Sequence, residues 1–189
     1  MSFDTAPRHL SLPLSRNVLA SLRAGEPCLL SGCMFTLRDA GHVRLLHEMQ
    51  ETAAGLPCSS PSLPYGLAGQ TIFYAGPTPS AAGRPFGSIG PTTASRMDFA
   101  APVLHRAGVV ATVGKGVRNR AVHDVCVETG SVYFVAVGGA AAFLAKCVVS
   151  STTLGYSELG TEALRRIEVV DFPVFVGIDT QGNDIYERL

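Results

Sequence analysis

The chain has 189 residues and a mass of 19.8 kDa, with 47% hydrophobic and 16% charged residues. A sequence this apolar can bury a sizeable core, which excludes disordered and low-complexity chains, and its length predicts one domain over residues 1–189. Lysine and arginine number 15, as do aspartate and glutamate, so the formal net charge is zero. This balance argues against nucleic-acid binding.

The neutral total conceals an uneven distribution of charge along the chain. Residues 52–123 hold six basic side chains and one acid, whereas residues 124–189 hold four basic and nine acidic ones. The middle block therefore favours a site for an anion. The alternative is that the blocks interleave in three dimensions and cancel, because most surface charges are merely solvated.

Cysteine usage limits the redox chemistry of the chain. The five cysteines are Cys28, Cys33, Cys58, Cys126 and Cys147. Their odd number and the absence of a C-x-x-C pair argue against a disulfide framework, a zinc site and an iron–sulfur cluster held by this chain alone. The N-terminus carries Asp4 and no apolar stretch, so we expect no secretory signal and a cytoplasmic location.

Hydrophobic periodicity and turn residues predict the elements of the first two thirds of the chain. Short strands are expected at 9–14 and 28–30, followed by a helix that begins at Thr36 as N-cap and continues to about residue 52. A loop at 55–69 precedes a strand at 71–75. A helix at about 97–107 ends at Gly108, a strand follows at 109–113, and a further helix has an apolar face from Val117 to Cys126 and ends at Gly130.

The apolar run 132–144 is too short for a membrane span and is divided by Gly138-Gly139. It predicts a strand at 131–137, a glycine turn and a helix at 140–146. Strands at 167–170 and 172–178 and a turn at 179–184 complete the chain. Strands and helices alternate in the middle, so the predicted class is α/β with a mixed sheet.

Three loops carry the chemically suggestive residues. Arg38 lies in the first turn of a predicted helix, where free backbone N–H groups already favour an anion. Arg96 follows Gly90-Pro91 beside the hydroxyls of Thr92 and Thr93, and Lys115 lies between two glycines at the end of a strand. Two guanidinium groups, an ammonium group and two hydroxyls are suited to a small dicarboxylate.

Each of these residues also has a simpler interpretation. Arg38 could pair with Asp39 or Glu26, the threonines could cap a helix, and Lys115 could be a solvated turn lysine. Nucleotide binding is disfavoured, because the glycines around Lys115 do not have the spacing of a P-loop and no G-x-G-x-x-G follows a strand.

The histidines and serines add little to this site. His42 could orient a site residue or serve a structural role, and its spacing from His47 does not suit a metal pair. His105 and His123 fall within predicted helices and are interpreted as structural. A G-x-S-x-G nucleophile motif is absent from the sequence.

Residues 90–98, Gly-Pro-Thr-Thr-Ala-Ser-Arg-Met-Asp, resemble the GPTT-x-G-RMD signature of the iron–sulfur-dependent hydro-lyases, the class I fumarase and L-tartrate dehydratase family, in its β subunit or C-terminal domain. Other segments resemble the same family in order and spacing. They are Leu-Arg-Asp-Ala-Gly-His at 37–42, the strand region 64–77, Gly-Lys-Gly at 114–116, Gly-Gly-Ala-Ala-Ala at 138–142, and Phe-Pro-Val-Phe at 172–175 with its closing turn 179–184.

The resemblance implies a swivelling β/β/α domain and a hetero-oligomer in which a separate α subunit ligates a 4Fe–4S cluster. It implies that Arg38, Arg96 and Lys115 bind the carboxylates of a substrate such as fumarate, malate, tartrate or oxaloacetate. It also implies that Thr92 is the base that removes a proton, with Thr93 close by. An unassisted threonine is far too weak an acid for this role, so neighbouring cations must stabilise its alkoxide.

The chain departs from the family pattern at four positions: Ser95 stands where Gly is usual, Leu37 and Gly41 where Ala is usual, and Val117 where a polar residue often follows Gly-Lys-Gly. None of these departures removes a charged group of the implied site. The contrasting hypothesis is a module without catalytic activity that binds carboxylates or regulates a partner.

Overall fold

A computed structural model describes residues 6–54, 63–80 and 83–188 of the protein. Seven strands in these residues form one sheet in the order β1-β2-β3-β4-β5-β7-β6. The strands are β1 (Arg8–Leu12), β2 (Pro27–Thr36), β3 (Thr71–Phe73), β4 (Ala111–Gly114), β5 (Val132–Val135), β6 (Val148–Gly155) and β7 (Leu164–Ile178). The α-helices are α1 (Arg16–Ser21), α2 (Asp39–Ala54), α3 (Ala101–Arg106), α4 (Arg120–Thr129) and α5 (Ala141–Lys146). Four 3₁₀ helices are η1 (Pro64–Gly66), η2 (Ala94–Met97), η3 (Ser157–Glu162) and η4 (Ile185–Arg188).

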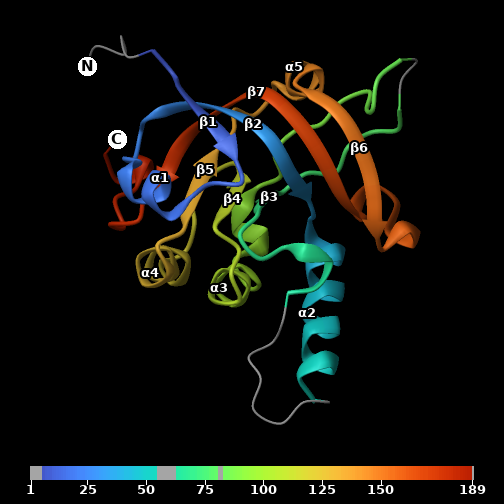
Figure 1. Ribbon diagram of the computed structural model, residues 1–189, viewed down its shortest axis with the longest axis horizontal. Helices are drawn as coiled ribbons and strands as arrows, with labels where there is room; N and C mark the ends of the chain where they lie inside the picture. Colours follow the sequence, from blue (N-terminus) through green and yellow to red (C-terminus); the bar gives the residue numbers. More distant parts are fainter. Residues whose placement is uncertain (1–5, 55–62, 81–82, 189) are drawn as a thin grey trace.

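The sheet is mixed and closes on itself. Strands β1 to β5 are parallel to one another, whereas β7 is antiparallel to β2, β5 and β6. Because β7 bonds to both β2 and β5, the strands β2, β3, β4, β5 and β7 form a closed ring. Helices α2, α3 and α4 lie on one side of the strands and α5 lies on the other (Figure 1). The predicted α/β class with a mixed sheet is therefore confirmed.

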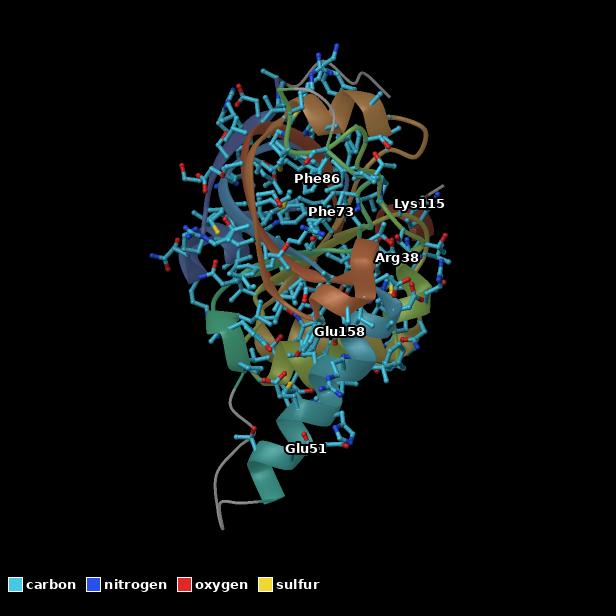
Figure 2. All side chains as sticks on the ribbon, turned by 90° about the vertical axis from the view of Figure 1, so that its right-hand side faces the viewer. Arg38, Glu51, Phe73, Phe86, Lys115 and Glu158 are labelled. Atoms are coloured by element: carbon cyan, nitrogen blue, oxygen red, sulfur yellow. The ribbon has the colours of Figure 1, made fainter. Side chains whose placement is uncertain are left out.

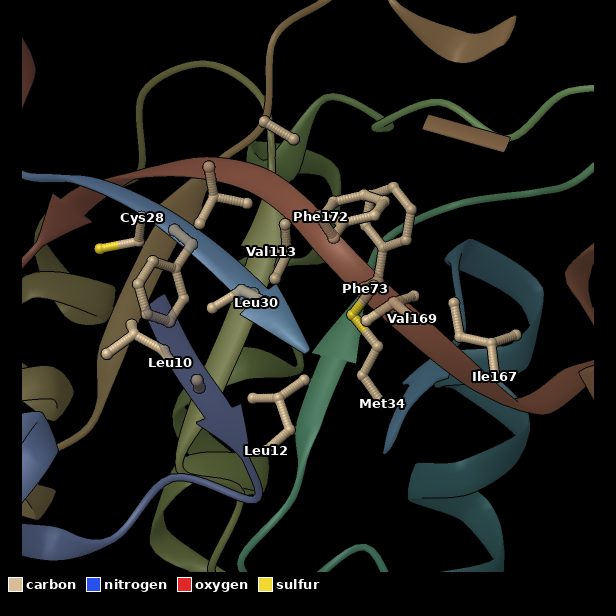
Figure 3. Close-up of a cluster of buried hydrophobic side chains, with 14 of the residues drawn as sticks. Leu10, Leu12, Cys28, Leu30, Met34, Phe73, Val113, Ile167, Val169 and Phe172 are labelled. Carbon is tan, nitrogen blue, oxygen red and sulfur yellow. The ribbon is translucent and has the colours of Figure 1, made fainter. Parts of the chain in front are cut away.

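Alternation along the strands divides the core into two clusters. Phe73 and Phe134 point into a cluster shared by β1, β2 and β7, whereas their neighbours Ile72 and Tyr133 point toward helices α2, α3 and α4. In the first cluster, Phe73 packs edge-on against Phe172 with ring centroids 5.2 Å apart (Figure 3). Strands β3, β4 and β5 are thus buried on both faces, which explains why these three strands are mostly apolar along their whole length.

The helix predicted to begin at Thr36 begins later, at Asp39. Thr36 is the last residue of β2, pairs with Arg165 of β7 and is fully buried, so it does not cap the helix. The sheet continues one step further, because the Leu37 N–H donates to the Phe73 carbonyl at 3.2 Å. The strand predicted at 28–30 is correspondingly the ten-residue β2.

Other predicted boundaries also differ from the structure. The helix expected at 97–107 is divided into η2 and α3, with a proline in the first turn of α3, where its missing N–H costs nothing. Val117 is 58% exposed and lies before α4, whose N-cap is Asn119. The two strands expected near the C-terminus are the single strand β7, and Asp171 within it adopts a positive φ of 49°. Elements α1, β6 and η3 were not predicted, and part of the loop predicted at 55–69 lies outside the described residues.

None of the helices in the described residues combines the length and the apolar character that a membrane crossing requires.

Candidate active site

The predicted site residues gather where the parallel strands β2, β3 and β4 end. Arg38 follows β2, and Lys115 follows β4. The Thr92 N–H donates to the Tyr74 carbonyl just beyond β3 at 2.7 Å, and the Lys115 N–H donates to the Thr92 carbonyl at 3.1 Å. The backbone of the threonine loop therefore lies against the backbone of the lysine loop. Figure 2 shows Arg38 and Lys115 on the same side of the molecule.

Glycines allow this close approach of the loops. A Cβ atom at Gly114 would lie 2.9 Å from the Cβ of Ala94 and 3.0 Å from the ring of Tyr74. Gly116 has a φ of 84°, which a residue with a side chain rarely adopts. The two glycines that flank Lys115 are thus required by contact and by backbone conformation, respectively.

Asp39 joins the two predicted arginines. Its carboxylate accepts a hydrogen bond from the Arg96 Nε at 2.9 Å, an Arg96 Nη lies 2.8 Å from its other oxygen, and the Arg38 Nε lies 3.4 Å from the same group. Arg38 also contacts Glu162 at 3.1 Å, whereas Glu26 pairs with Arg8 instead. The Arg96 side chain remains 51% exposed and so keeps N–H groups for a ligand.

Lys115 and the two threonines are open to solvent. The Lys115 side chain is exposed and makes no ion pair within the part of the chain that the structure describes. Thr92 is half-buried and Thr93 is exposed, and although Thr93 precedes η2, its hydroxyl does not cap that helix. The interpretation of Thr93 as an ordinary helix cap is therefore wrong.

Most basic side chains of residues 52–123 are paired with acids, so their excess does not by itself form an anion site as the sequence indicated. Arg106 pairs with Glu128 and Arg120 pairs with Asp124, both acids of the C-terminal block. Arg96 and Arg118 pair with Asp39 and Asp98. The blocks largely interleave and cancel, as the alternative held, so the site is marked by its place at the strand ends rather than by the block charge.

Arg118 is a buried residue that the sequence did not distinguish from its exposed neighbours. Its side chain is 0% exposed, donates to Asp98 at 2.6 Å and lies over the rings of Tyr74 and Tyr133. Burial lowers the pKa of the guanidinium, but Tyr74 and Asp98 outweigh this and raise it above its usual value. Asp98 also accepts from the Asn119 N–H at 2.8 Å. The pair ties the signature loop to the segment that follows Lys115.

His42 lies directly beneath Arg38. Its Nδ1 lies 2.9 Å from the Arg38 carbonyl, which can only accept, so Nδ1 carries the proton. Burial lowers the His42 pKa to about 4, and the ring is therefore neutral near pH 7. His42 holds the backbone of Arg38 and does not itself reach the open face.

The described residues do not form a ligand set for a metal or cluster. No group of three or more His, Cys, Asp or Glu side chains there could hold a metal ion. The four described cysteines are free, and burial raises the pKa of Cys28 to about 12 and that of Cys126 to about 11. Thiols that stay protonated are poor iron ligands. Cys58 lies outside the described residues.

A comparison with models of protein families identifies the family of the chain. The model described as the fumarase C-terminus matches residues 4–189. The chain belongs to this family. Among curated relatives, fumarate hydratase 2 of Leishmania major is 37% identical over 175 residues, covering 92% of this chain and 29% of the relative. The anaerobic class I fumarate hydratase of Escherichia coli K12 is 36% identical over 162 residues, which are 85% of this chain and 28% of the relative.

The chain spans less than a third of these fumarate hydratases, so it corresponds to only one part of them. It matches a separate subunit over much more of its length. The L(+)-tartrate dehydratase subunit beta of Escherichia coli K12 is 32% identical over 181 residues, covering 93% of this chain and 85% of that subunit. The fumarase C-terminus family thus occurs both as part of a longer chain and as a subunit called beta.

Proposed function

We propose that this chain is the β subunit of a hydro-lyase that adds water to, or removes it from, a small dicarboxylate such as fumarate, malate, tartrate or oxaloacetate. The observation that carries the proposal is the meeting of the Lys115 and Thr92 loops beside Arg38 and Arg96. The partner is an α subunit, in a hetero-oligomer. The location is the cytoplasm, where free thiols such as the four described here persist.

Each site residue has a role in this proposal. Arg38, Arg96 and Lys115 bind the two carboxylates, since a guanidinium forms paired hydrogen bonds with a carboxylate and an ammonium neutralises it. Thr92 accepts the proton from the carbon beside one carboxylate, and the Lys115 charge on the adjoining loop stabilises the alkoxide form of the hydroxyl. Thr93, exposed beside it, contributes a further hydroxyl for binding.

A 4Fe–4S cluster belongs to the proposal as a group of the α subunit, because the described residues of this chain do not fit it. When bound there, the cluster supplies a Lewis acid for the hydroxyl that is added or lost. The residues of this chain bind and orient the carboxylates and move the proton.

The test is anaerobic co-expression with the α partner, followed by hydratase assays on the dicarboxylates above. The complex should turn over at least one of them, and the purified chain alone should turn over none. Arg96→Ala should abolish activity and leave the fold intact, because the side chain is 51% exposed. Arg106→Ala is the matched control, since that arginine is 54% exposed and also paired with a carboxylate, Glu128. Full turnover by Arg96→Ala would refute the site, and an inactive complex that still binds dicarboxylates would favour a regulatory module.

A further inference from the structure

One carboxylate of η3, an element that the sequence did not predict, reaches the start of α2. The Glu162 Oε2 accepts a hydrogen bond from the Ala40 N–H at 2.7 Å, and Oε1 lies 3.1 Å from an Nη of Arg38. The two side chains are only 20% and 25% exposed. Glu162 therefore satisfies a free N–H of the first turn of the helix and holds the guanidinium of a proposed substrate ligand at the same time.

The surroundings of Arg38 leave its side chain little freedom. A Cβ atom at Gly76 would lie 2.6 Å from Nη1 of Arg38 and 3.0 Å from its Cδ. The guanidinium thus passes directly over the backbone at residue 76, between the carboxylates of Asp39 and Glu162. Contacts on three sides fix one conformation of a side chain that is otherwise among the most flexible.

The approach of η3 to α2 depends on a second glycine. A Cβ atom at Gly41 would lie 2.7 Å from the Glu162 carbonyl oxygen and would overlap the Leu37 Cδ1 atom. Leu37 is fully buried. The absence of a side chain at residue 41 therefore leaves room both for Leu37 and for the backbone of η3 at Glu162.

We propose that Glu162 is a positioning residue for substrate binding. It holds the Arg38 guanidinium in the orientation that receives a carboxylate, and the absence of a side chain at Gly41 permits its approach. This inference rests on the proposed function and deepens it. A fixed guanidinium loses less conformational entropy when the substrate binds. Because the carboxylate is present in both the ground state and the transition state, the effect falls on KM rather than on kcat.

The decisive variant is Glu162→Gln in the complete α/β complex. The amide oxygen of Gln can still accept the Ala40 N–H, so the helix start is kept while the negative charge that faces the Arg38 guanidinium is removed. We expect KM for the dicarboxylate to rise by about fivefold, with kcat changed by less than about twofold. Glu158→Gln, in the same 3₁₀ helix but exposed, is the matched control and should leave both constants unchanged. An unchanged or lower KM in Glu162→Gln would overturn the proposal.

The Gly41 contact gives an independent test. Gly41→Ala should raise KM in the same way as Glu162→Gln, because the added methyl group would meet the Glu162 carbonyl oxygen, and it should add nothing to KM in the double variant. Additive effects of Gly41→Ala and Glu162→Gln would contradict the shared route through Arg38.

A readout without turnover separates this inference from the proposed function. In the ¹⁵N-labelled full chain, an ion pair slows rotation of the Arg38 guanidinium and should give resolved Nη signals, assigned by their loss in Arg38→Lys. These signals should merge in Glu162→Gln and persist in Glu158→Gln. If the wild-type complex hydrates no dicarboxylate, the proposed function fails whatever the spectra show. If the wild type is active and the signals are the same in Glu162→Gln, only the positioning role fails.

Discussion

The buried ion pair between Arg118 and Asp98 makes the sharpest prediction about stability. Asp98→Asn keeps the size of the side chain and an oxygen that can accept the Asn119 N–H, but it removes the negative charge. The guanidinium then stays buried with the Thr112 hydroxyl at 3.4 Å and the two aromatic rings, whose centroids lie 5.3 and 4.8 Å away. A buried charge without its counter-charge is strongly destabilising.

The size of the effect follows from this geometry. Removal of one partner of a buried pair costs about 3–5 kcal/mol. The faces of Tyr74 and Tyr133 already contact the cation in the wild type and remain after the substitution, so they limit the loss to the lower end of that range. We therefore expect Asp98→Asn to lower the free energy of unfolding by about 3 kcal/mol. With a denaturant slope of about 2 kcal/mol/M, the urea midpoint should fall by about 1.5 M.

The assay is urea unfolding at pH 7, followed by circular dichroism. The double variant Arg118→Met/Asp98→Asn removes both charges and should be more stable than Asp98→Asn alone, because no unpaired charge remains buried. A loss below about 1 kcal/mol in Asp98→Asn would refute the account of Arg118 as a buried cation dependent on Asp98.

Three further predictions concern pH and helix capping. Burial lowers the pKa of both His42 and His105 to about 4 from a value of 6.5, so the unfolded chain binds more protons between these values and stability should fall as pH drops from about 6.5 to 4. When the free energy of unfolding is measured with urea at a series of pH values, His105→Gln should reduce its fall between pH 6.5 and 4. The same fall in the variant and the wild type would contradict this prediction. Burial raises the pKa of Asp179, but hydrogen bonds from Asn183, Ala24 and Gln181 outweigh this effect and lower the pKa below 3.8. The ionised Asp179 should therefore stabilise the fold above about pH 4, and this stabilisation should be lost as the pH falls through the lowered pKa. Asp179→Ala should remove that acid-dependent loss, measured in the same series. Asn119→Ala removes the side-chain acceptor of the Val122 N–H and should destabilise the chain by about 1 kcal/mol in urea, whereas no change would mean that water replaces the cap.

Local sequence signals predicted the helix ends correctly where a single glycine determines the backbone conformation. Gly130 ends α4 with a φ of 64°, and Gly108, with a φ of 119°, follows α3 as predicted. Thr36 shows the limit of such signals. It is a good N-cap residue by type, but pairing with Arg165, 129 positions further along the chain, keeps it in β2. Non-local pairing overrides local preference when the strand is already anchored on both sides.

The sequence by itself determined the α/β class, the family resemblance and the loops that bear Arg38, Thr92, Arg96 and Lys115, because these depend on short motifs at strand ends. Only the tertiary structure decided which acidic side chain each basic side chain pairs with. Four of the six cations in the middle block are paired with acids from other segments or buried with Asp98, and the apparent positive charge is largely cancelled. The sequence also gave no sign that Glu162 contacts Arg38, since 124 positions separate them and only the packing of η3 against Gly41 brings them together.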